Sequence, residues 1–332
     1  MQYFFFVLML FALGCSDEKE IECTLAGLCG QEFPVGKYID VTAGHYHGCG
    51  IDERGAVGCW GTGMVFGYTE AWHHVYAESG YSKVIAGESY SCAIGNAGVS
   101  CWGIGQDKQP PTQSSSGEAI DFTEIIPGLT YIWGIEEGEQ HVFWGEGIEP
   151  SIFQMMAPGS IAAQSTGPFV HAKAGWYQNC GLSESGLLEC WGCTCPEELE
   201  LLCGSLHYQT DYGQCEVPQE TFVNMDASLY HTCGINTEGK ALCWGCESST
   251  GNGQCQSSEG PYVQIATGMH HNCAILEDGY VECWGRSDLG QTSPPAVKFD
   301  SISCGALHCC GLGQDGEAYC WGDDWERQSS PM

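Results

Sequence analysis

Cysteine is the residue type that gives this sequence most of its possible chemistry. The chain of 332 residues contains 23 cysteines, and twelve of them form six pairs whose members stand nine or ten residues apart. These pairs are Cys49 and Cys59, Cys92 and Cys101, Cys180 and Cys190, Cys233 and Cys243, Cys273 and Cys283, and Cys310 and Cys320. Thiols at a fixed spacing can form disulfides, bind a metal ion or take part in redox exchange. The elements that carry the pairs decide between these chemistries.

The residues between the two cysteines of a pair have the pattern of a β-hairpin. Glu277, Asp278 and Gly279 separate two β-rich runs, and a three-residue loop that ends on glycine is a common antiparallel connection. Such a hairpin places Cys273 opposite Cys283, at a Cα separation of about 4.5 to 5.5 Å that a disulfide can span. We therefore predict one cross-strand disulfide within each pair.

The hairpin recurs seven times, once without cysteine. Trp133 and Phe143 stand at the spacing of the other pairs, as an aromatic cross-strand pair in the same place. Every second member of a pair is followed by Trp-Gly, and a small residue stands five positions before every first member. These small residues are Gly44, Gly87, Gly128, Gly175, Ser228, Gly268 and Gly305. A period of roughly 40 residues with strand-like units is typical of a β-propeller.

We therefore expect an all-β fold, a seven-bladed β-propeller of four-stranded antiparallel blades stapled by disulfides, in residues 31–332. Only ten residues follow Gly322, which is too few for an outer strand and a return. We therefore expect the ring to close with an N-terminal strand near Gln31–Gly36. Closure of this kind leaves fewer exposed sheet edges, which otherwise invite aggregation.

The N-terminus has the features of an export signal. Residues 1–14 are apolar and uncharged, too short to span a bilayer, and are followed by Cys15 and a charged stretch. This resembles a bacterial lipoprotein signal, which implies lipidation of Cys15; an ordinary secretory signal is the alternative. Residues 15–30 are expected to be a short linker or cap, in which Cys23 and Cys29 form a bridge.

Charge and cysteine content restrict the compartment and the partners. The net charge of −32, from 10 Lys and Arg against 42 Asp and Glu, repels phosphate backbones and excludes nucleic acid as a partner. The number of cysteines indicates an oxidising compartment, because cytosolic reductants would keep these thiols reduced. The protein is therefore expected to be exported, at the cell envelope or secreted.

Two Cys-x-x-Cys segments, Cys190 to Cys193 and Cys243 to Cys246, have the spacing of a redox motif. That motif belongs at the start of a helix in a βαβ unit, whereas here the first cysteine of each segment is a hairpin cysteine. Four cysteines that follow the fourth repeat could hold zinc, although their irregular spacing favours disulfides. They are Cys193, Cys195, Cys203 and Cys215, and their pairing stays open, as does that of Cys304 and Cys309.

Histidine occupies one repeat position, two residues before the first hairpin cysteine. The four histidines are His47, His231, His271 and His308. Tyr90, Tyr131 and Gln178 take the same position in other repeats, so we favour a hydrogen-bonding role over metal binding. No Ser-His-Asp order, phosphate-binding glycine loop or His-Glu-x-x-His helix is present. We therefore expect no enzyme activity, no cofactor and no metal site.

The longest link between repeats, Cys193 to Ala227, is the candidate partner surface. Loops on a rigid scaffold are where binding sites tend to lie. This link combines carboxylates and amphipathic aromatic residues, which suit a basic protein surface: Glu197, Glu198, Glu200, Tyr208, Asp211 and Tyr212. A neutral insertion is the alternative.

The segment Ala266–Gly285 has the pattern Ala-x-Gly-x-x-His-x-Cys-Ala-Ile-x-x-x-Gly-x-Val-x-Cys-Trp-Gly, and Arg286–Gln291 follows it. This pattern resembles the repeat of the regulator of chromosome condensation family, in a cysteine-rich bacterial variety, over about Tyr38 to Gly322. The resemblance implies a seven-bladed propeller. Members of that family include an exchange factor for a small nuclear GTPase and a bacterial inhibitor of β-lactamase, and neither role transfers by fold alone.

We therefore expect an exported, lipid-anchored and monomeric β-propeller that acts as a protein interaction scaffold at the bacterial cell surface. The alternatives are a guanine-nucleotide exchange factor, a secreted enzyme inhibitor and a purely structural envelope protein.

Overall fold

The computed structural model describes residues 37–61, 75–76, 80–103 except 89 and 97, 122–128, 131–136, 141–145, 169–193 except 176 and 177, 212–246, 252–325, 328–329 and 331. The described residues form strands and turns. No helix among them is long and apolar enough to cross a membrane.

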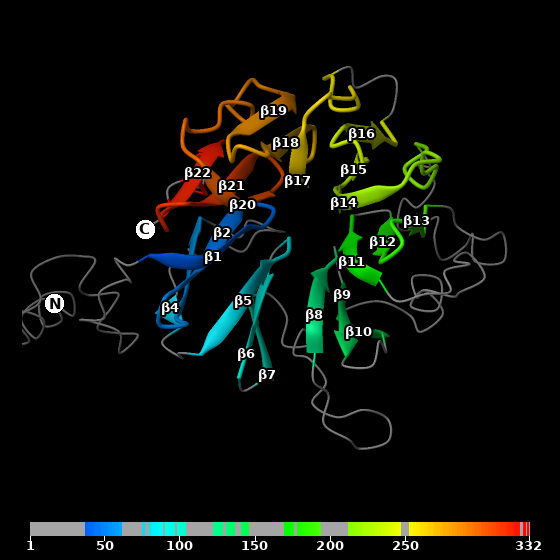
Figure 1. Cartoon of the computed structure of the whole chain (residues 1–332). Coiled ribbons are helices and arrows are strands. Elements are labelled where there is room, and N and C mark those ends of the chain that lie inside the picture. Colours follow the sequence, from blue (N-terminus) through cyan, green and yellow to red (C-terminus); the bar gives the residue numbers. More distant parts are fainter. Residues whose placement is uncertain are drawn as a thin grey trace, which may run out of the picture. The chain divides into compact units, whose positions relative to one another are not determined.

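Seven antiparallel sheets make up the structure (Figure 1). Their first strands are β1 (Tyr38–Ala43), β5 (Tyr81–Ala86), β8 (Phe122–Pro127), β11 (Phe169–Ala174), β14 (Phe222–Ala227), β17 (Tyr262–Thr267) and β20 (Phe299–Cys304). The second strands are β2 (His47–Asp52), β6 (Tyr90–Gly95), β9 (Tyr131–Glu136), β12 (Asn179–Ser183), β15 (Thr232–Asn236), β18 (His271–Leu276) and β21 (His308–Gly313). The third strands are β3 (Val57–Gly61), β7 (Gly98–Gly103), β10 (His141–Gly145), β13 (Leu188–Trp191), β16 (Ala241–Trp244), β19 (Val281–Gly285) and β22 (Ala318–Gly322).

The first strands of the sheets form a closed ring. Each first strand contacts that of the next sheet along the chain, and β20 of the last sheet contacts β1 of the first. The sheets are therefore seven blades of one propeller, numbered here from one (β1) to seven (β20). In Figure 1 they follow one another around the ring.

Each hairpin has the register that the spacing predicts. Cys273 lies opposite Cys283, and Trp133 lies opposite Phe143. All six predicted pairs are joined by disulfides with Cα separations of 4.0 to 4.1 Å. Three further disulfides join Cys193 to Cys215, Cys246 to Cys255, and Cys304 to Cys309.

A fourth strand is less common among the described residues than we expected. The first sheet has one, β4 (Val75–Tyr76), and the fifth has a single bridge between Ala241 and Ser258. Between β19 and β20 the chain forms turns instead, and there the Gln291 side chain is buried and accepts a hydrogen bond from the Leu289 amide at 2.9 Å. This short link folds back onto the core, so it cannot also extend along the blade edge.

The C-terminal tail takes part in ring closure. The backbone carbonyl of Gln328 accepts a hydrogen bond of 3.1 Å from Trp60 Nε1 in blade one. The carbonyls of Gln214 and Gln291 accept equivalent bonds from the tryptophans of blades five and seven, at 2.9 and 3.0 Å. The tail after blade seven therefore accepts a tryptophan hydrogen bond from blade one, as the links before blades five and seven do from those blades. The strand expected at Gln31–Gly36 lies outside the described residues.

Apolar side chains fill the spaces between neighbouring blades. One cluster joins Cys180 and Leu182 of blade four to Phe222 and Met225 of blade five. Gly234 on β15 is required for this packing, because a Cβ there would lie 2.5 Å from the Phe222 ring. A blade therefore cannot bury its faces alone, and the closed ring completes the core.

Candidate functional site

The axial channel is the cavity that the fold creates. It has a volume of about 350 Å³ and is lined by residues from the first strands of all seven blades. Because side chains alternate along a strand, one repeat position of each first strand faces the same surface. The third residue of each is polar: Asp40, Lys83, Glu124, His171, Asn224, Gln264 and Ser301.

Several of these polar side chains connect neighbouring blades. The backbone amide of Val84 donates to Asp40 at 2.8 Å, and that of Ile265 donates to Asn224 at 3.0 Å. Gln264 accepts from the Ile302 amide at 3.1 Å. The polar ring therefore satisfies backbone groups of the adjacent first strand, in addition to lining the channel.

Charged residues of the channel lie on one arc, in blades one to five, and four of them form two ion pairs. Lys83 lies 3.7 Å from Glu124, and Lys173 lies 3.2 Å from Asp226. The carboxylate of Asp226 raises the pKa of Lys173, while burial and the charge of Lys173 lower the pKa of His171. The Thr267 hydroxyl also donates to the Asp226 carboxylate at 3.1 Å, so the charged groups of this arc are engaged with neighbouring channel residues.

The repeat histidines are buried between blades. His231 Nε2 donates to Asn272 Oδ1 at 2.6 Å, and His47 Nε2 lies at hydrogen-bond distance, 2.7 Å, from Ser91 Oγ. Burial lowers the pKa of both histidines to about 4, so they are neutral at pH 7. Gln178 at the same position also bonds to the next blade, donating to the Ser228 carbonyl at 2.9 Å. The expected hydrogen-bonding role is confirmed for His47, His231 and Gln178, which tie one blade to the next.

His308 differs from the other repeat histidines. It is fully buried, and its pKa is lowered to about 3 by burial, yet neither ring nitrogen bonds to a side chain. The equivalent partners in other blades are the residues before the hairpin cysteine, such as Ser91 and Asn272. In blade one this residue is Gly48, which has no side-chain acceptor.

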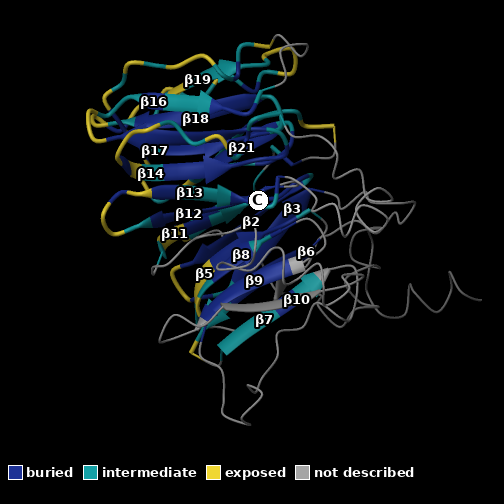
Figure 2. Ribbon diagram, turned by 90° about the vertical axis from the view of Figure 1, so that its right-hand side faces the viewer, coloured by how far each residue is buried: buried dark blue, intermediate teal, exposed yellow. Residues whose placement is uncertain are grey.

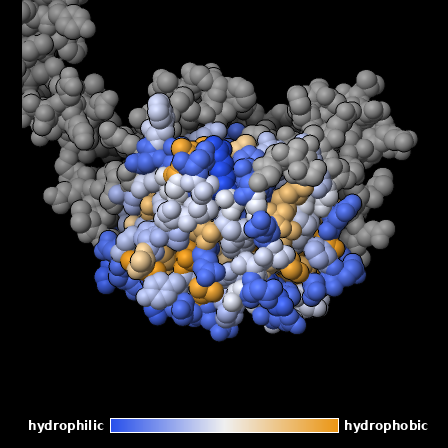
Figure 3. Space-filling model, turned by 90° about the horizontal axis from the view of Figure 1, so that it is seen from above, coloured by the Kyte–Doolittle hydropathy of each residue, from blue (hydrophilic) through white to orange (hydrophobic). Residues whose placement is uncertain are grey.

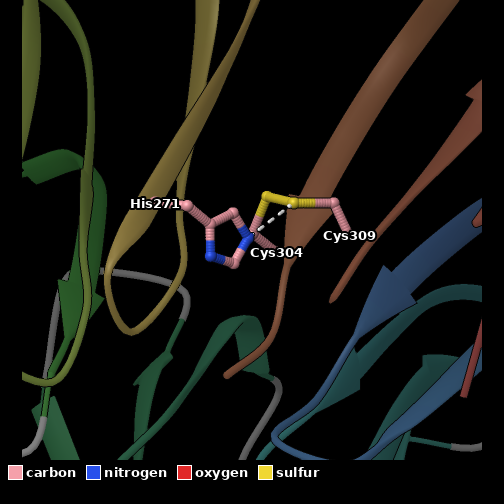
Figure 4. Close-up of side chains that lie close together, drawn as sticks. All are labelled: His271, Cys304 and Cys309. Atoms are coloured by element: carbon pink, nitrogen blue, oxygen red, sulfur yellow. Dashed lines mark hydrogen bonds between the residues drawn. A yellow bond between two sulfur atoms is a disulfide. The ribbon is translucent and has the colours of Figure 1, made fainter. Parts of the chain in front are cut away.

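One group of metal-ligand side chains occurs in the described part of the chain: His271, Cys304 and Cys309 (Figure 4). The two sulfurs form a disulfide, and Cys309 Sγ lies 3.2 Å from His271 Nε2. Cysteine binds a metal ion as a free thiolate, which a disulfide does not provide. In this oxidised form the group is therefore a disulfide packed against a histidine.

The Cys-x-x-Cys segments have no internal disulfide. Cys190 and Cys243 pair within their hairpins. The second cysteines of these segments close links, Cys193 with Cys215 and Cys246 with Cys255. This arrangement contradicts a dithiol active site at either segment. It also removes Cys193 and Cys215 from the zinc alternative; Cys195 and Cys203 lie outside the described residues.

Most of the predicted partner surface lies outside the described residues, as does the lipidation site Cys15. The residues concerned are Glu197, Glu198, Glu200, Tyr208 and Asp211. Tyr212 is described, and its ring packs edge-on against Tyr230 at a centroid distance of 6.2 Å. Tyr230 in turn stacks on His270 at 5.6 Å. The sequence analysis missed both partners, although each directly precedes a repeat histidine.

The sequence matches the regulator of chromosome condensation (RCC1) repeat in residues 222–254, 262–291 and 299–324. These segments correspond to blades five, six and seven with the links that follow them.

Solved structures show the same fold at low sequence identity. The CRINKLY WD40 ectodomain of the Arabidopsis thaliana receptor kinase ACR4 is 19% identical, with a TM-score of 0.61 over 90% of this chain and 100% of that one. Human WBSCR16 is 14% identical, with a TM-score of 0.60 over 85% of this chain and 88% of that one. The ectodomain of the Physcomitrella patens receptor kinase CR4 is 18% identical, with a TM-score of 0.58 over 85% and 72%. Together with the closed ring of blades, these matches show a seven-bladed β-propeller in which blades five, six and seven match the regulator of chromosome condensation repeat.

Proposed function

We propose that the protein is an exported, lipid-anchored and monomeric scaffold that binds a protein partner at the outer surface of a bacterial cell. The observation that carries this proposal is a ring of blades with nine disulfides among the described residues. Disulfides in such number form in oxidising compartments. A stapled ring holds its loops in place, which lowers the ordering cost of binding.

The chemistry of the partner follows from charge and from the longest link. A net charge of −32 favours a basic protein surface and disfavours nucleic acid. We place the partner on the link from Cys193 to Ala227, through Glu197, Glu198, Glu200, Tyr208, Asp211 and Tyr212. The Cys193–Cys215 disulfide constrains this link, and Tyr212 joins it to the aromatic stack on blades five and six.

Replacement of Cys15 tests the anchor. Cys15→Ala should move the protein from the membrane fraction to the soluble fraction, whereas the neighbouring Ser16→Ala should leave it in the membrane. Mass spectrometry of the wild-type N-terminus should find acyl chains on Cys15. A soluble, unacylated wild type would replace anchoring by simple secretion.

A nucleotide-release assay separates the scaffold from the exchange factor that the family resemblance implies. A partner is first isolated from envelope extracts by pull-down, and its nucleotide release is then measured with and without the propeller. A scaffold leaves the release rate unchanged, and so does an inhibitor of another enzyme class. Accelerated release would overturn the scaffold in favour of an exchange factor.

Shortening the link tests the partner surface. A Gly-Ser bridge in place of residues 194–211 keeps the Cys193–Cys215 disulfide and the Gln214 carbonyl that accepts a hydrogen bond from Trp244. It should leave a protease-resistant propeller that no longer binds the partner. Full binding by this variant would place the site on other loops.

A further inference from the structure

Exposed apolar side chains are concentrated at two repeat positions. Eight large hydrophobic residues are exposed in the described part of the chain, and six of them occupy these positions. Ile39, Val170, Val223 and Val263 are each the second residue of a first strand, and Leu187 and Tyr280 each follow the glycine of a hairpin turn. Isolated exposed apolar residues need no explanation, but a recurrent set does.

The two positions lie next to each other in space. The Phe222 amide beside Val223 donates to the carbonyl of Gly186, which precedes Leu187, at 2.9 Å. The Phe299 amide donates in the same way to Gly279, beside Tyr280, at 2.9 Å. The turn of one blade therefore adjoins the start of the next first strand, and the exposed side chains share one face.

We call this surface the hairpin face: the turns between second and third strands, with the first two residues of the first strands and the residue before each of these strands. It lies at the opposite end of the second strands from the aromatic stack of Tyr230 and His270. In Figure 2 exposed residues gather at the left, where these turns lie. In Figure 3 the same face runs along the lower edge, where hydrophobic residues lie between hydrophilic ones.

The charges of the hairpin face are mostly negative. Its exposed acidic residues are Glu53, Glu184, Glu238, Glu277, Asp278, Asp300, Asp315 and Glu317. Its basic residues are fewer, and most are engaged. Arg54 pairs with Asp52 at 2.7 Å, Lys240 pairs with Glu238 and Glu259 at 3.4 Å each, and Lys298 lies over the Tyr280 ring at 5.4 Å. Lys37 is the remaining one.

We propose that the hairpin face of blades four to six is a second docking surface, for a protein segment that carries both basic and apolar side chains. Valine and leucine side chains supply the apolar contacts, and the acidic turns supply complementary charge. The same carboxylates would repel an anionic membrane, which disfavours a lipid surface as the occupant. The inference rests on the proposed scaffold function but goes beyond it, since this face includes none of the residues assigned to that partner, Glu197, Glu198, Glu200, Tyr208, Asp211 and Tyr212.

Paired substitutions on the full chain test the face. The probe is a short synthetic peptide alternating Leu and Lys, with Leu-Glu and Ser-Lys peptides as controls, and affinity is measured by calorimetry. We expect the Leu-Lys peptide to bind more tightly than either control. Val223→Ser with Val263→Ser should weaken the affinity for this peptide about tenfold, because the two half-exposed valines can no longer bury apolar surface against it. Leu289→Ser, an exposed leucine of a link, should leave affinity unchanged.

Four results would overturn the proposal. Equal affinity of the double variant and the wild type would place binding elsewhere, and equal affinity for the Leu-Lys and Ser-Lys peptides would reduce it to charge alone. Tighter binding to anionic vesicles than to the peptide would make the occupant a membrane. The link-shortened variant separates this face from the scaffold proposal: it should keep full Leu-Lys affinity while losing the envelope partner. Loss of both by that variant would contradict a separate face.

Discussion

The seam between blades five and six and the seam between blades seven and one contain equivalent histidines with different surroundings. In the first seam, His231 donates to Asn272, and Asn272 donates to the Gln254 carbonyl at 2.6 Å. In the second seam, His308 faces Gly48 and bonds to no side chain. The comparison teaches that the closing seam lacks the histidine contact and is held by its other groups.

Those other groups come from the tail and the channel. Trp60 donates to the Gln328 carbonyl, and the Ala43 amide donates to Ser303 Oγ at 3.2 Å. Backbone contacts add to them, since the Ala306 amide donates to the His45 carbonyl at 3.2 Å. The closing seam joins residues about as far apart in sequence as the fold permits, so its contacts carry the largest loop-closure entropy.

Acid should destabilise both seams, and this is the largest effect we expect. Burial lowers the pKa of His231 to about 4 and that of His308 to about 3, against about 6.5 in the unfolded chain. The unfolded state then binds more protons, so stability is present above pH 6.5 and is lost as pH falls towards these values. For His231, a pKa shift of this size corresponds to a loss of about 3 kcal/mol in the free energy of unfolding when the pH falls to the folded-state value. Urea unfolding at several pH values from 7 to 4 measures this loss. His231→Gln should reduce the slope of the free energy of unfolding against pH.

Loss of Trp60 should open the closing seam. The side chain is 1% exposed, and Trp60→Ala removes both its packing against Tyr38 and its bond to Gln328. We expect a loss of about 3 to 5 kcal/mol in the free energy of unfolding at pH 7. Trp60→Phe should recover part of the packing without the hydrogen bond. A loss below about 1 kcal/mol would mean that the tail contact does not hold the ring closed.

Removal of a single histidine should distinguish the two seams. His231→Leu leaves Asn272 Oδ1 buried without its donor, and we expect a cost of about 1 to 3 kcal/mol at pH 7. His308→Leu deprives no side chain of a partner, so it should be close to neutral or stabilising. Both substitutions should also weaken the dependence of the free energy of unfolding on pH. Equal costs at pH 7 would show that His308 has a polar partner of equal strength.

The blades could be predicted from local spacing in the sequence. The contacts between distant repeats could not. Cys273 and Cys283 are related by one hairpin, so their pairing follows from turn length and alternation alone. The contact of Gln328 with Trp60 joins the two ends of the ring, and no local pattern marks it. The exposed Val223 and Val263 were also missed, because alternation along a first strand does not say which positions the next blade covers. Between β19 and β20 the expected fourth strand is absent for a related reason: Gln291 packs into the core instead.

Loss of Ser303 should give the smallest effect on the closing seam. Its hydroxyl accepts the hydrogen bond of the Ala43 amide, and the two residues belong to blades at opposite ends of the chain. Ser303→Ala leaves this amide without its acceptor at the channel wall, and we expect a loss of about 1 kcal/mol. Ser301 lies on the same strand and also lines the channel, so Ser301→Ala is the matched control and should change stability by less than about 0.5 kcal/mol. Thermal unfolding of both variants at pH 7 gives the difference. Identical melting temperatures would mean that channel water replaces the lost acceptor, and the closing seam would then depend on Trp60 and the tail.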